Sequence, residues 1–271
     1  MIDKDLVVGA LVTEWAAIDA LLSGLDAAQW ERATPCPHWS VRDVVGHLIG
    51  TERALLGERP AAAEADVAGR AHVHNEIGLV NERWIESQRG ESPERLLERF
   101  REVTATRGAA LAAMSGEDFH ASSWTPAGQG TYARFMRIRV FDCWMHEQDI
   151  RDAVDRPGHE DGTPAEVAMD EIAEVLGYLV GKRAAVPDGD SVTLVLDGPL
   201  RRTLHVLVDG RARVVPRLDG PATASLTLPS GLFTRLCGGR VEPDERALAA
   251  VRIDGDQDLG RRVAGSLRFT I

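Results

Sequence analysis

Lysine and cysteine are both scarce in this chain of 271 residues. The first scarcity concerns the genome that encodes the chain, and the second concerns its fold and chemistry. Lys4 and Lys182 are the only lysines, so the other 29 of the 31 basic residues are arginines (31 − 2), a bias typical of a GC-rich genome. The cysteines number only three, Cys36, Cys143 and Cys237, and no CxxC pattern is present. An odd and sparse set of cysteines argues against a disulfide framework and a thioredoxin-like reaction, and it favours a reducing cytoplasm.

Long apolar runs and excess positive charge are also missing. No stretch reads as the roughly 20 apolar residues that cross a bilayer, and Asp3, Lys4 and Asp5 precede a helical pattern, so we expect neither a membrane span nor a secretory signal. Acidic residues outnumber basic ones by 42 to 31, which gives a net charge of −11. This balance excludes a general nucleic-acid or anionic-membrane binder. With 44% hydrophobic and 27% charged residues, the chain is expected to be a soluble, acidic, cytosolic protein.

From Asp5 to about Ala185 the apolar pattern has a helical period. Ser40, with Asp43 three residues later, resembles a capping box and predicts the start of a helix that carries His47. Gly24 predicts the end of the first helix. Further helices are predicted at about 64–88, 93–115, 131–154 and 164–183, and they indicate a four-helix bundle with additional helical segments.

Near Val186 the period of the pattern changes. Residues 187–190 form a turn-rich linker, and alternating apolar residues then predict strands at 192–197, 204–208, 213–216 and 224–228. Asp209-Gly210 is a hairpin signal, and short helices are predicted at 230–237 and 258–264. The fold class is therefore a helical bundle joined to a smaller α+β domain, with domains 1–185 and 186–271.

The segment from Val140 to Arg151 carries the most informative polar residues. At about 100° per residue, Asp142, His146 and Asp149 share one helix face inside an apolar stripe, where unpaired polar groups are costly. His47 lies at the edge of the apolar face of its own helix and can complete a His–Asp–His set. Two nitrogens, one oxygen and an open fourth position suit a catalytic zinc ion. The plain alternatives are a structural histidine and a surface contact between residues four apart.

Two segments resemble the signatures of one family. Residues 35–48 (PCPHWSVRDVVGHL) and 139–151, with the core WMHEQDIR, are similar to the mycothiol-dependent maleylpyruvate isomerase family, which belongs to the DinB-like metal-binding four-helix bundles. The C-terminal part resembles the sterol-carrier-like domain that those proteins append. Two separate motifs in the right order, together with the tail, extend the resemblance over nearly the whole chain.

The resemblance implies a divalent metal, usually zinc, held by His47, Asp142 and His146. The family often has Glu where this chain has Asp142, so the helix must approach the metal by about one C–C bond length, which is small against normal variation in helix packing. Asp149 is a candidate for supporting a ligand histidine. Arg240 and Arg252 are candidates for binding an anionic substrate. No catalytic residue beyond the metal centre is predicted.

The predicted activity is attack by a thiol, mycothiol, on a small electrophilic substrate, with the metal holding the thiol as a thiolate. Release of a conjugate would make the protein an S-transferase for detoxification, whereas loss of the thiol after bond rotation would make it a cis–trans isomerase, maleylpyruvate isomerase itself included. A non-catalytic, metal-stabilised stress protein that binds a thiol or another ligand is the alternative from another class. Cys36 and Cys143 are expected to be packing residues, not nucleophiles. No nucleic-acid or membrane partner is expected, and the sequence does not distinguish a monomer from a dimer.

Overall fold

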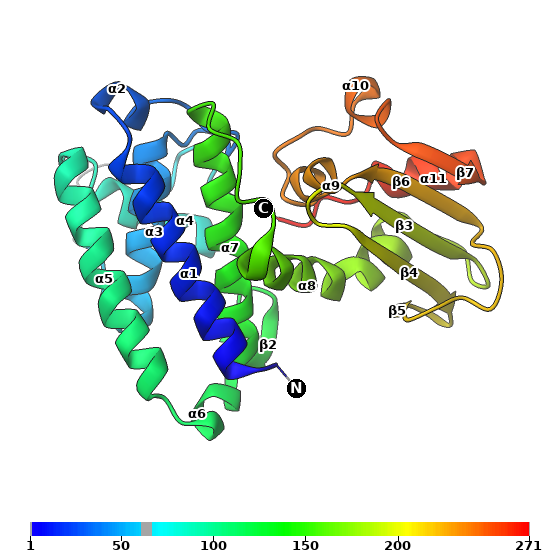
Figure 1. The fold of residues 1–271 in the computed structure, drawn as a ribbon, viewed down its shortest axis with the longest axis horizontal. Coiled ribbons are helices and arrows are strands. Elements are labelled where there is room, and N and C mark those ends of the chain that lie inside the picture. Colours follow the sequence, from blue (N-terminus) through cyan, green and yellow to red (C-terminus); the bar gives the residue numbers. More distant parts are fainter. Residues whose placement is uncertain (1, 61–66, 271) are drawn as a thin grey trace. The chain divides into compact units, whose positions relative to one another are not determined.

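The computed structural model describes residues 2–60 and 67–270, and the chain divides into two compact units, Met1–Gly158 and His159–Ile271 (Figure 1). The first unit is almost entirely helical, and the second combines helices with a five-stranded sheet. This confirms the predicted fold class.

Four long helices make up the frame of the first unit. α1 packs against α5 and α7, and α3 packs against α5, α7 and the shorter α4. α3 begins at the predicted residue, because the side chain of Ser40 accepts a hydrogen bond from the backbone N–H of Asp43 and the Asp43 carboxylate caps Ser40 in return. In chain order the elements of this unit are α1 (Lys4–Ser23), α2 (Ala27–Trp30), α3 (Val41–Leu55), α4 (Glu76–Glu86), α5 (Pro93–Ala113), α6 (Gly116–His120), β1 (Ser122–Thr125), β2 (Gly128–Thr131) and α7 (Tyr132–Ala153).

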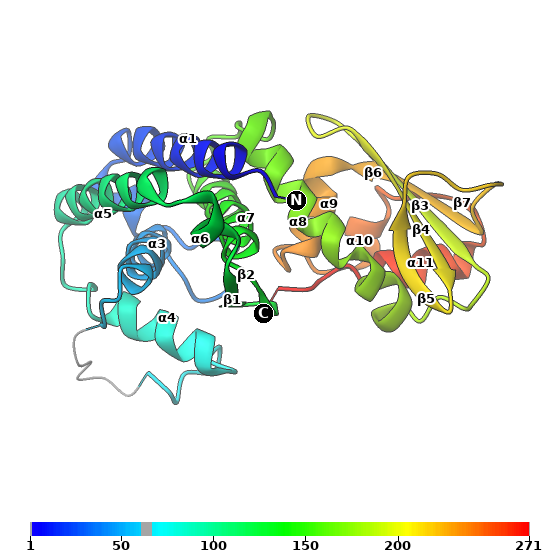
Figure 2. The same ribbon diagram turned by 90° about the horizontal axis from the view of Figure 1, so that it is seen from below.

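α1 is a core helix of the bundle. Contrary to the expectation from the sequence, it is long and apolar enough, by length and composition alone, to cross a membrane. Its residues Ala10, Leu11 and Ile18 are nonetheless fully buried, and the helix lies beside α5 and α7 in both ribbon views (Figures 1 and 2). The apolar face of α1 is therefore explained by burial within the unit.

One local prediction for the first unit was wrong. The helix predicted at 64–88 begins only at Glu76, where the Asn75 side chain caps it by accepting from the N–H of Gly78; residues 64–66 lie outside the described part. Directly before α7, β1 and β2 form a short antiparallel hairpin, in which Gly128 takes a φ of +94°. The hairpin leads into α7 through Thr131, whose side chain caps that helix.

The second unit is built on a mixed sheet with the strand order β5-β4-β3-β6-β7. β3 and β6 are parallel, and the other neighbours are antiparallel. The predicted turn at Asp209-Gly210 joins β4 to β5, with Gly210 at a φ of +65°. Buried residues alternate along β4 and β6, and the sheet is contacted by α8, α9 and α11. The elements are α8 (Gly162–Tyr178), the π-helix η1 (Leu179–Arg183), β3 (Ser191–Asp197), β4 (Arg202–Asp209), β5 (Arg211–Val215), β6 (Ala224–Pro229), α9 (Ser230–Cys237), α10 (Glu245–Leu248), β7 (Arg252–Gly255) and α11 (Gln257–Ala264).

The division between the units lies after Gly158, whereas the sequence placed the boundary at Val186. The difference is α8, which packs on β4 and β5. A Cβ at Gly177 would lie 2.8 Å from the carbonyl oxygen of Ala212, so glycine allows this helix to approach the sheet closely. Helical periodicity alone assigned α8 to the bundle, since the strands it covers come later in the sequence.

Candidate metal centre

The structure brings the three predicted ligands together between two helices of the bundle. His47 comes from α3, and Asp142 and His146 come from successive turns of α7. One nitrogen or oxygen atom of each residue lies within 4.8 Å of the others. Both histidines are buried, with 5% of their surface exposed, whereas the Asp142 side chain is 29% exposed. The cluster is thus inside the bundle but open on the carboxylate side.

The spacing of the donor atoms fits a divalent cation. Nε2 of His47 lies 3.2 Å from Oδ2 of Asp142, and Nε2 of His146 lies 3.6 Å from Oδ1 of the same carboxylate. Ligands at the usual 2.0–2.1 Å from a tetrahedral zinc ion are about 3.4 Å apart. Nδ1 of His47 is buried and has no hydrogen-bond partner among the described residues. The Asp142 carboxylate thus lies beside both histidines without the extra methylene of a glutamate.

The electrostatics of the cluster favour a neutral His47 and an ionised Asp142. Burial lowers the pKa of His47, and the nearby positive charge of Arg139 adds to this effect, while Asp142 opposes it. Burial alone would raise the pKa of Asp142, but Arg139 and both histidines hold it well below its usual value. A neutral imidazole and an ionised carboxylate are the states that coordinate a cation.

Asp149 contacts the ligand histidine that the sequence assigned to it. Its Oδ2 lies 2.9 Å from Nδ1 of His146, and only 1% of its surface is exposed. A hydrogen bond donated by Nδ1–H to this carboxylate would leave the Nε2 lone pair toward Asp142. The geometry suits a supporting role for Asp149, which stays a prediction.

A buried chain of charges adjoins the site and was missed in the sequence. Arg139, one turn before Asp142 on α7, donates to Asp142 Oδ2 and to Glu52 Oε1, the latter from Nη2 at 2.8 Å. The other oxygen of Glu52 accepts from Nε of Arg107 at 2.9 Å. Arg107, Glu52 and Arg139 have 3% or less of their side chains exposed. Only contact between α3, α5 and α7 joins these residues, which lie far apart in the sequence.

Trp39 forms an aromatic wall beside the two histidines. Its ring centroid lies 5.1 Å from that of His47 and 5.7 Å from that of His146. Its indole N–H donates to Oε1 of Glu82 at 2.7 Å, and Glu82 also pairs with Arg70. The sequence did not assign Trp39 to the site. Its position directly before the helix that carries His47 was the available signal that it lies there.

The structure also places the cysteines and arginines that the sequence analysis considered. Cys143 is buried, as expected for a packing residue, but half-exposed Cys36 lies near His146 and Asp149. Arg240 and Arg252 both belong to the second unit. The side chain of Arg240 donates to the carbonyl oxygen of Gly238 at 2.7 Å, and exposed Arg252 lies 3.4 Å from Asp254. A role for either arginine in substrate binding stays a prediction.

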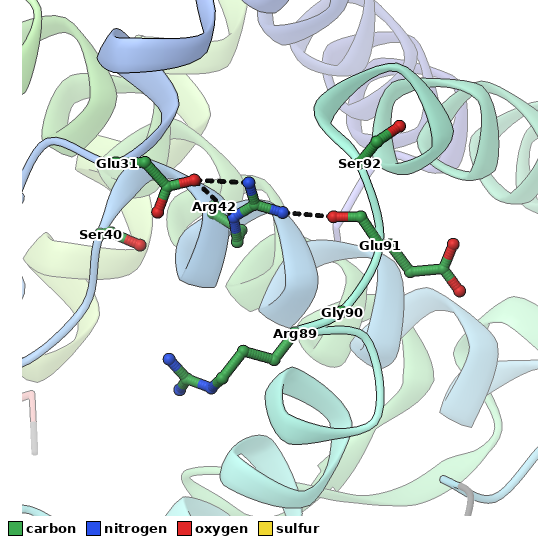
Figure 3. A pocket seen from close by; sticks show the side chains of 7 residues that line it. All are labelled: Glu31, Ser40, Arg42, Arg89, Gly90, Glu91 and Ser92. Atoms are coloured by element: carbon green, nitrogen blue, oxygen red, sulfur yellow. Dashed lines mark hydrogen bonds and ion pairs between the residues drawn. The ribbon is translucent and has the colours of Figure 1, made fainter.

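A surface pocket of about 440 Å³ lies where α3 and α5 begin (Figure 3). Its arginines are already engaged: Arg42 donates to the Glu31 carboxylate and to the carbonyl oxygen of Glu91, and Arg89 pairs with Asp43 and Glu86. None of the three predicted metal ligands lines it. The lining residues are Glu31, Ser40, Arg42, Arg89, Gly90, Glu91 and Ser92.

A helical bundle with a histidine–carboxylate cluster between two of its helices, followed by an α+β unit, defines the class of this protein. The family model described as "Mycothiol maleylpyruvate isomerase N-terminal domain" matches residues 11–151, and "MDMPI C-terminal domain" matches residues 166–262. The first match covers the whole cluster. The chain belongs to the mycothiol maleylpyruvate isomerase family.

Two solved structures are similar to this chain in fold, and two curated relatives are similar in part of their sequence. Crystal structures of the mycothiol-dependent maleylpyruvate isomerase are similar in fold: a histidine-to-alanine mutant has a TM-score of 0.58 at 14% identity, covering 93% of each chain. A second structure of that enzyme has a TM-score of 0.56 at 15% identity over 88% of this chain and 90% of that one. The curated relatives are uncharacterized proteins of two strains of Mycobacterium tuberculosis, each 29% identical over 159 residues, which span 57% of this chain and 58% of the relative.

Proposed function

We propose that this protein is a metal-dependent enzyme that uses mycothiol to isomerise a small cis-unsaturated acid of the maleylpyruvate type. The observation that carries the proposal is the cluster of His47, Asp142 and His146, whose donor atoms have the spacing of a cation site. Family membership supports the choice of thiol and reaction. Cysteines that form no disulfide support a reducing, cytoplasmic location.

In this proposal His47, Asp142 and His146 would hold a divalent ion, zinc being the expected one. When bound, the ion supplies positive charge that lowers the pKa of a thiol ligand. Asp149 fixes the proton of His146 on Nδ1, so that Nε2 stays a donor of electrons. Trp39 covers the two imidazole rings and limits the access of water to them.

In the proposed reaction, covalent bonds form and break only in the thiol and the substrate. The thiolate sulfur adds to one carbon of the C=C bond, and the electron pair moves into the conjugated carbonyl. Rotation about the resulting single bond and expulsion of the thiolate then give the trans isomer. One C–S bond forms and breaks, and no net oxidation occurs. Release of the adduct in place of expulsion would give an S-transferase.

Metal analysis tests the ligand assignment. The purified protein should contain about one divalent ion per chain, and the double variant His47→Ala/His146→Ala should lose it. His205→Ala is the matched control, because His205 lies on β4 of the second unit and bonds to Thr193. Full metal content in the double variant would contradict the assignment.

A turnover assay tests the reaction. Maleylpyruvate is incubated with the metal-loaded enzyme and a catalytic amount of mycothiol, and the trans product and the thiol adduct are both measured. Trans product without loss of thiol supports the proposal. Accumulation of the adduct identifies a transferase, and the absence of any metal-dependent rate identifies a binding protein; either outcome refutes the isomerase.

A further inference from the structure

Cys36 lies beside the candidate metal centre, on the side of His146 and Asp149. Its Sγ, a ring nitrogen of His146 and a carboxylate oxygen of Asp149 all lie within 4.8 Å of one another. His146 and Asp149 are buried, whereas Cys36 is half-exposed. We propose that Cys36, His146 and Asp149 form a second, thiolate-containing metal site that overlaps the first site at His146.

Two fixed ligands and one adjustable ligand make up this second set. His146 and Asp149 are held one turn apart on α7, with Nδ1 and Oδ2 2.9 Å apart. Cys36 belongs to a tight loop in which the carbonyl oxygen of Trp39 accepts from the Thr34 backbone at 2.9 Å, and the N–H of Trp39 donates to the carbonyl of Cys36 at 3.2 Å. These bonds hold the backbone conformation of the loop that carries Cys36.

The separations are within reach of a zinc or cadmium ion. With a Zn–S bond of 2.3 Å and a Zn–N bond near 2.05 Å, a tetrahedral ion holds its sulfur and nitrogen ligands about 3.6 Å apart. The ligand atoms lie at most 4.8 Å apart, so the Cys36 sulfur must move by at most roughly 1.2 Å toward the nitrogen of His146 to reach this separation. A χ1 rotation of the half-exposed Cys36 side chain moves the sulfur by that amount. The thiolate directs the choice of metal toward thiophilic ions.

Sharing His146 makes the two sites interdependent. Binding through the second set requires that the proton between Nδ1 of His146 and Asp149 leaves to solvent, and it removes the hydrogen bond by which Asp149 orients this histidine for the first set. A thiophilic ion at Cys36 therefore competes with the His47–Asp142–His146 set. The binding step is independent of the proposed activity, whereas inhibition by such an ion rests on the proposed function.

Cadmium is the probe for this site, because a cadmium–thiolate bond has a charge-transfer absorption in the near ultraviolet. The metal-free protein is titrated with Cd²⁺ alone. The band should form in the wild type, disappear in Cys36→Ser and persist in Cys237→Ala, whose buried cysteine lies in the second unit. Asp149→Asn should weaken cadmium binding, followed by this absorption band, at least tenfold.

The His47→Ala variant separates the two sites. It removes a ligand of the first set only, so the cadmium band should remain. Absence of the band in the wild type, its persistence in Cys36→Ser, or its loss in His47→Ala would each overturn a separate site at Cys36. Zinc content of Cys36→Ser reports on the first set alone, so failure of this inference is distinguishable from failure of the proposed function.

Discussion

Glu52 is the residue whose replacement should most damage the first unit without touching a predicted metal ligand. It stands between two buried arginines, with Nε of Arg107 at 2.9 Å and Nη2 of Arg139 at 2.8 Å. Its side chain is 1% exposed, and each arginine side chain is 3% exposed. In Glu52→Gln the two guanidinium groups keep their charges but lose the anion between them.

The expected loss follows from the burial of all three groups. Removing one partner of a buried ion pair costs about 3–5 kcal/mol, because the remaining charge is left uncompensated away from water. For a domain of this size 1 kcal/mol corresponds to a shift in Tm of about 2–4 °C, so Tm should fall by roughly 6–20 °C. Replacing Arg107 by Met in the same chain leaves Arg139 paired with Asp142 and should restore part of the loss.

Thermal unfolding followed by circular dichroism measures the effect. Glu58→Gln is the matched control, because Glu58 pairs with Arg53 at 2.6 Å but both side chains are about one-third or more exposed. Such a surface pair contributes about 0–1 kcal/mol. A Tm of Glu52→Gln within 2 °C of the control would refute the view that the Arg107–Glu52–Arg139 chain is a buried, mutually dependent unit.

Two further predictions concern the core of the same unit. Burial, reinforced by Glu147, raises the pKa of Glu14 well above its ordinary value, so stability is complete below the unfolded pKa of about 4.3 and declines as the pH rises through the folded pKa. Glu14→Gln should remove that decline, and urea unfolding at pH 5 and pH 8 would contradict this if both proteins kept the same pH dependence. Gly50→Ala should cost about 1–3 kcal/mol, because a Cβ there lies 2.4 Å from the Trp84 side chain. Gly46→Ala, where the nearest atom is 3.6 Å away, should be neutral or stabilising, and equal urea midpoints for the two alanine variants would refute the packing argument.

Much of the fold could be predicted because its long helices and main turns are specified by residues that are neighbours in the sequence. The capping box at Ser40 and the Asp209-Gly210 turn were correct, since each depends on neighbouring residues alone. β7 and the β1–β2 hairpin were missed because each strand has only four residues, nearly all of them exposed or half-exposed, which gives little alternation to recognise. The position of α8 depended on strands about 40 residues later, which no helical pattern reveals.

Some residues of the candidate site could likewise be predicted from local sequence, and others could not. Asp142, His146 and Asp149 could be predicted as one group because they share a face of a single helix, and their contacts follow from helix geometry. His47 could be offered as a further member from its place at the edge of its own apolar helix face, and the resemblance to a family then supported that choice. Arg139 and Glu52 could not be paired in advance, because 87 residues separate them and only the packing of α3 on α7 brings them together.

Asp142 takes part both in contacts within one helix and in contacts that depend on helix packing. Its carboxylate accepts from Arg139 and lies next to Nε2 of both histidines, so one short side chain serves the buried charge chain and the candidate metal site. A cation bound there is attracted by Asp142 but repelled by the Arg139 guanidinium, and Glu52 reduces that repulsion by neutralising the arginine. With a divalent ion held as proposed, the residual positive charge would favour an anionic ligand such as a thiolate over a neutral thiol. The buried arginines would thereby connect the stability of the bundle to the class of ligand that the proposed site selects.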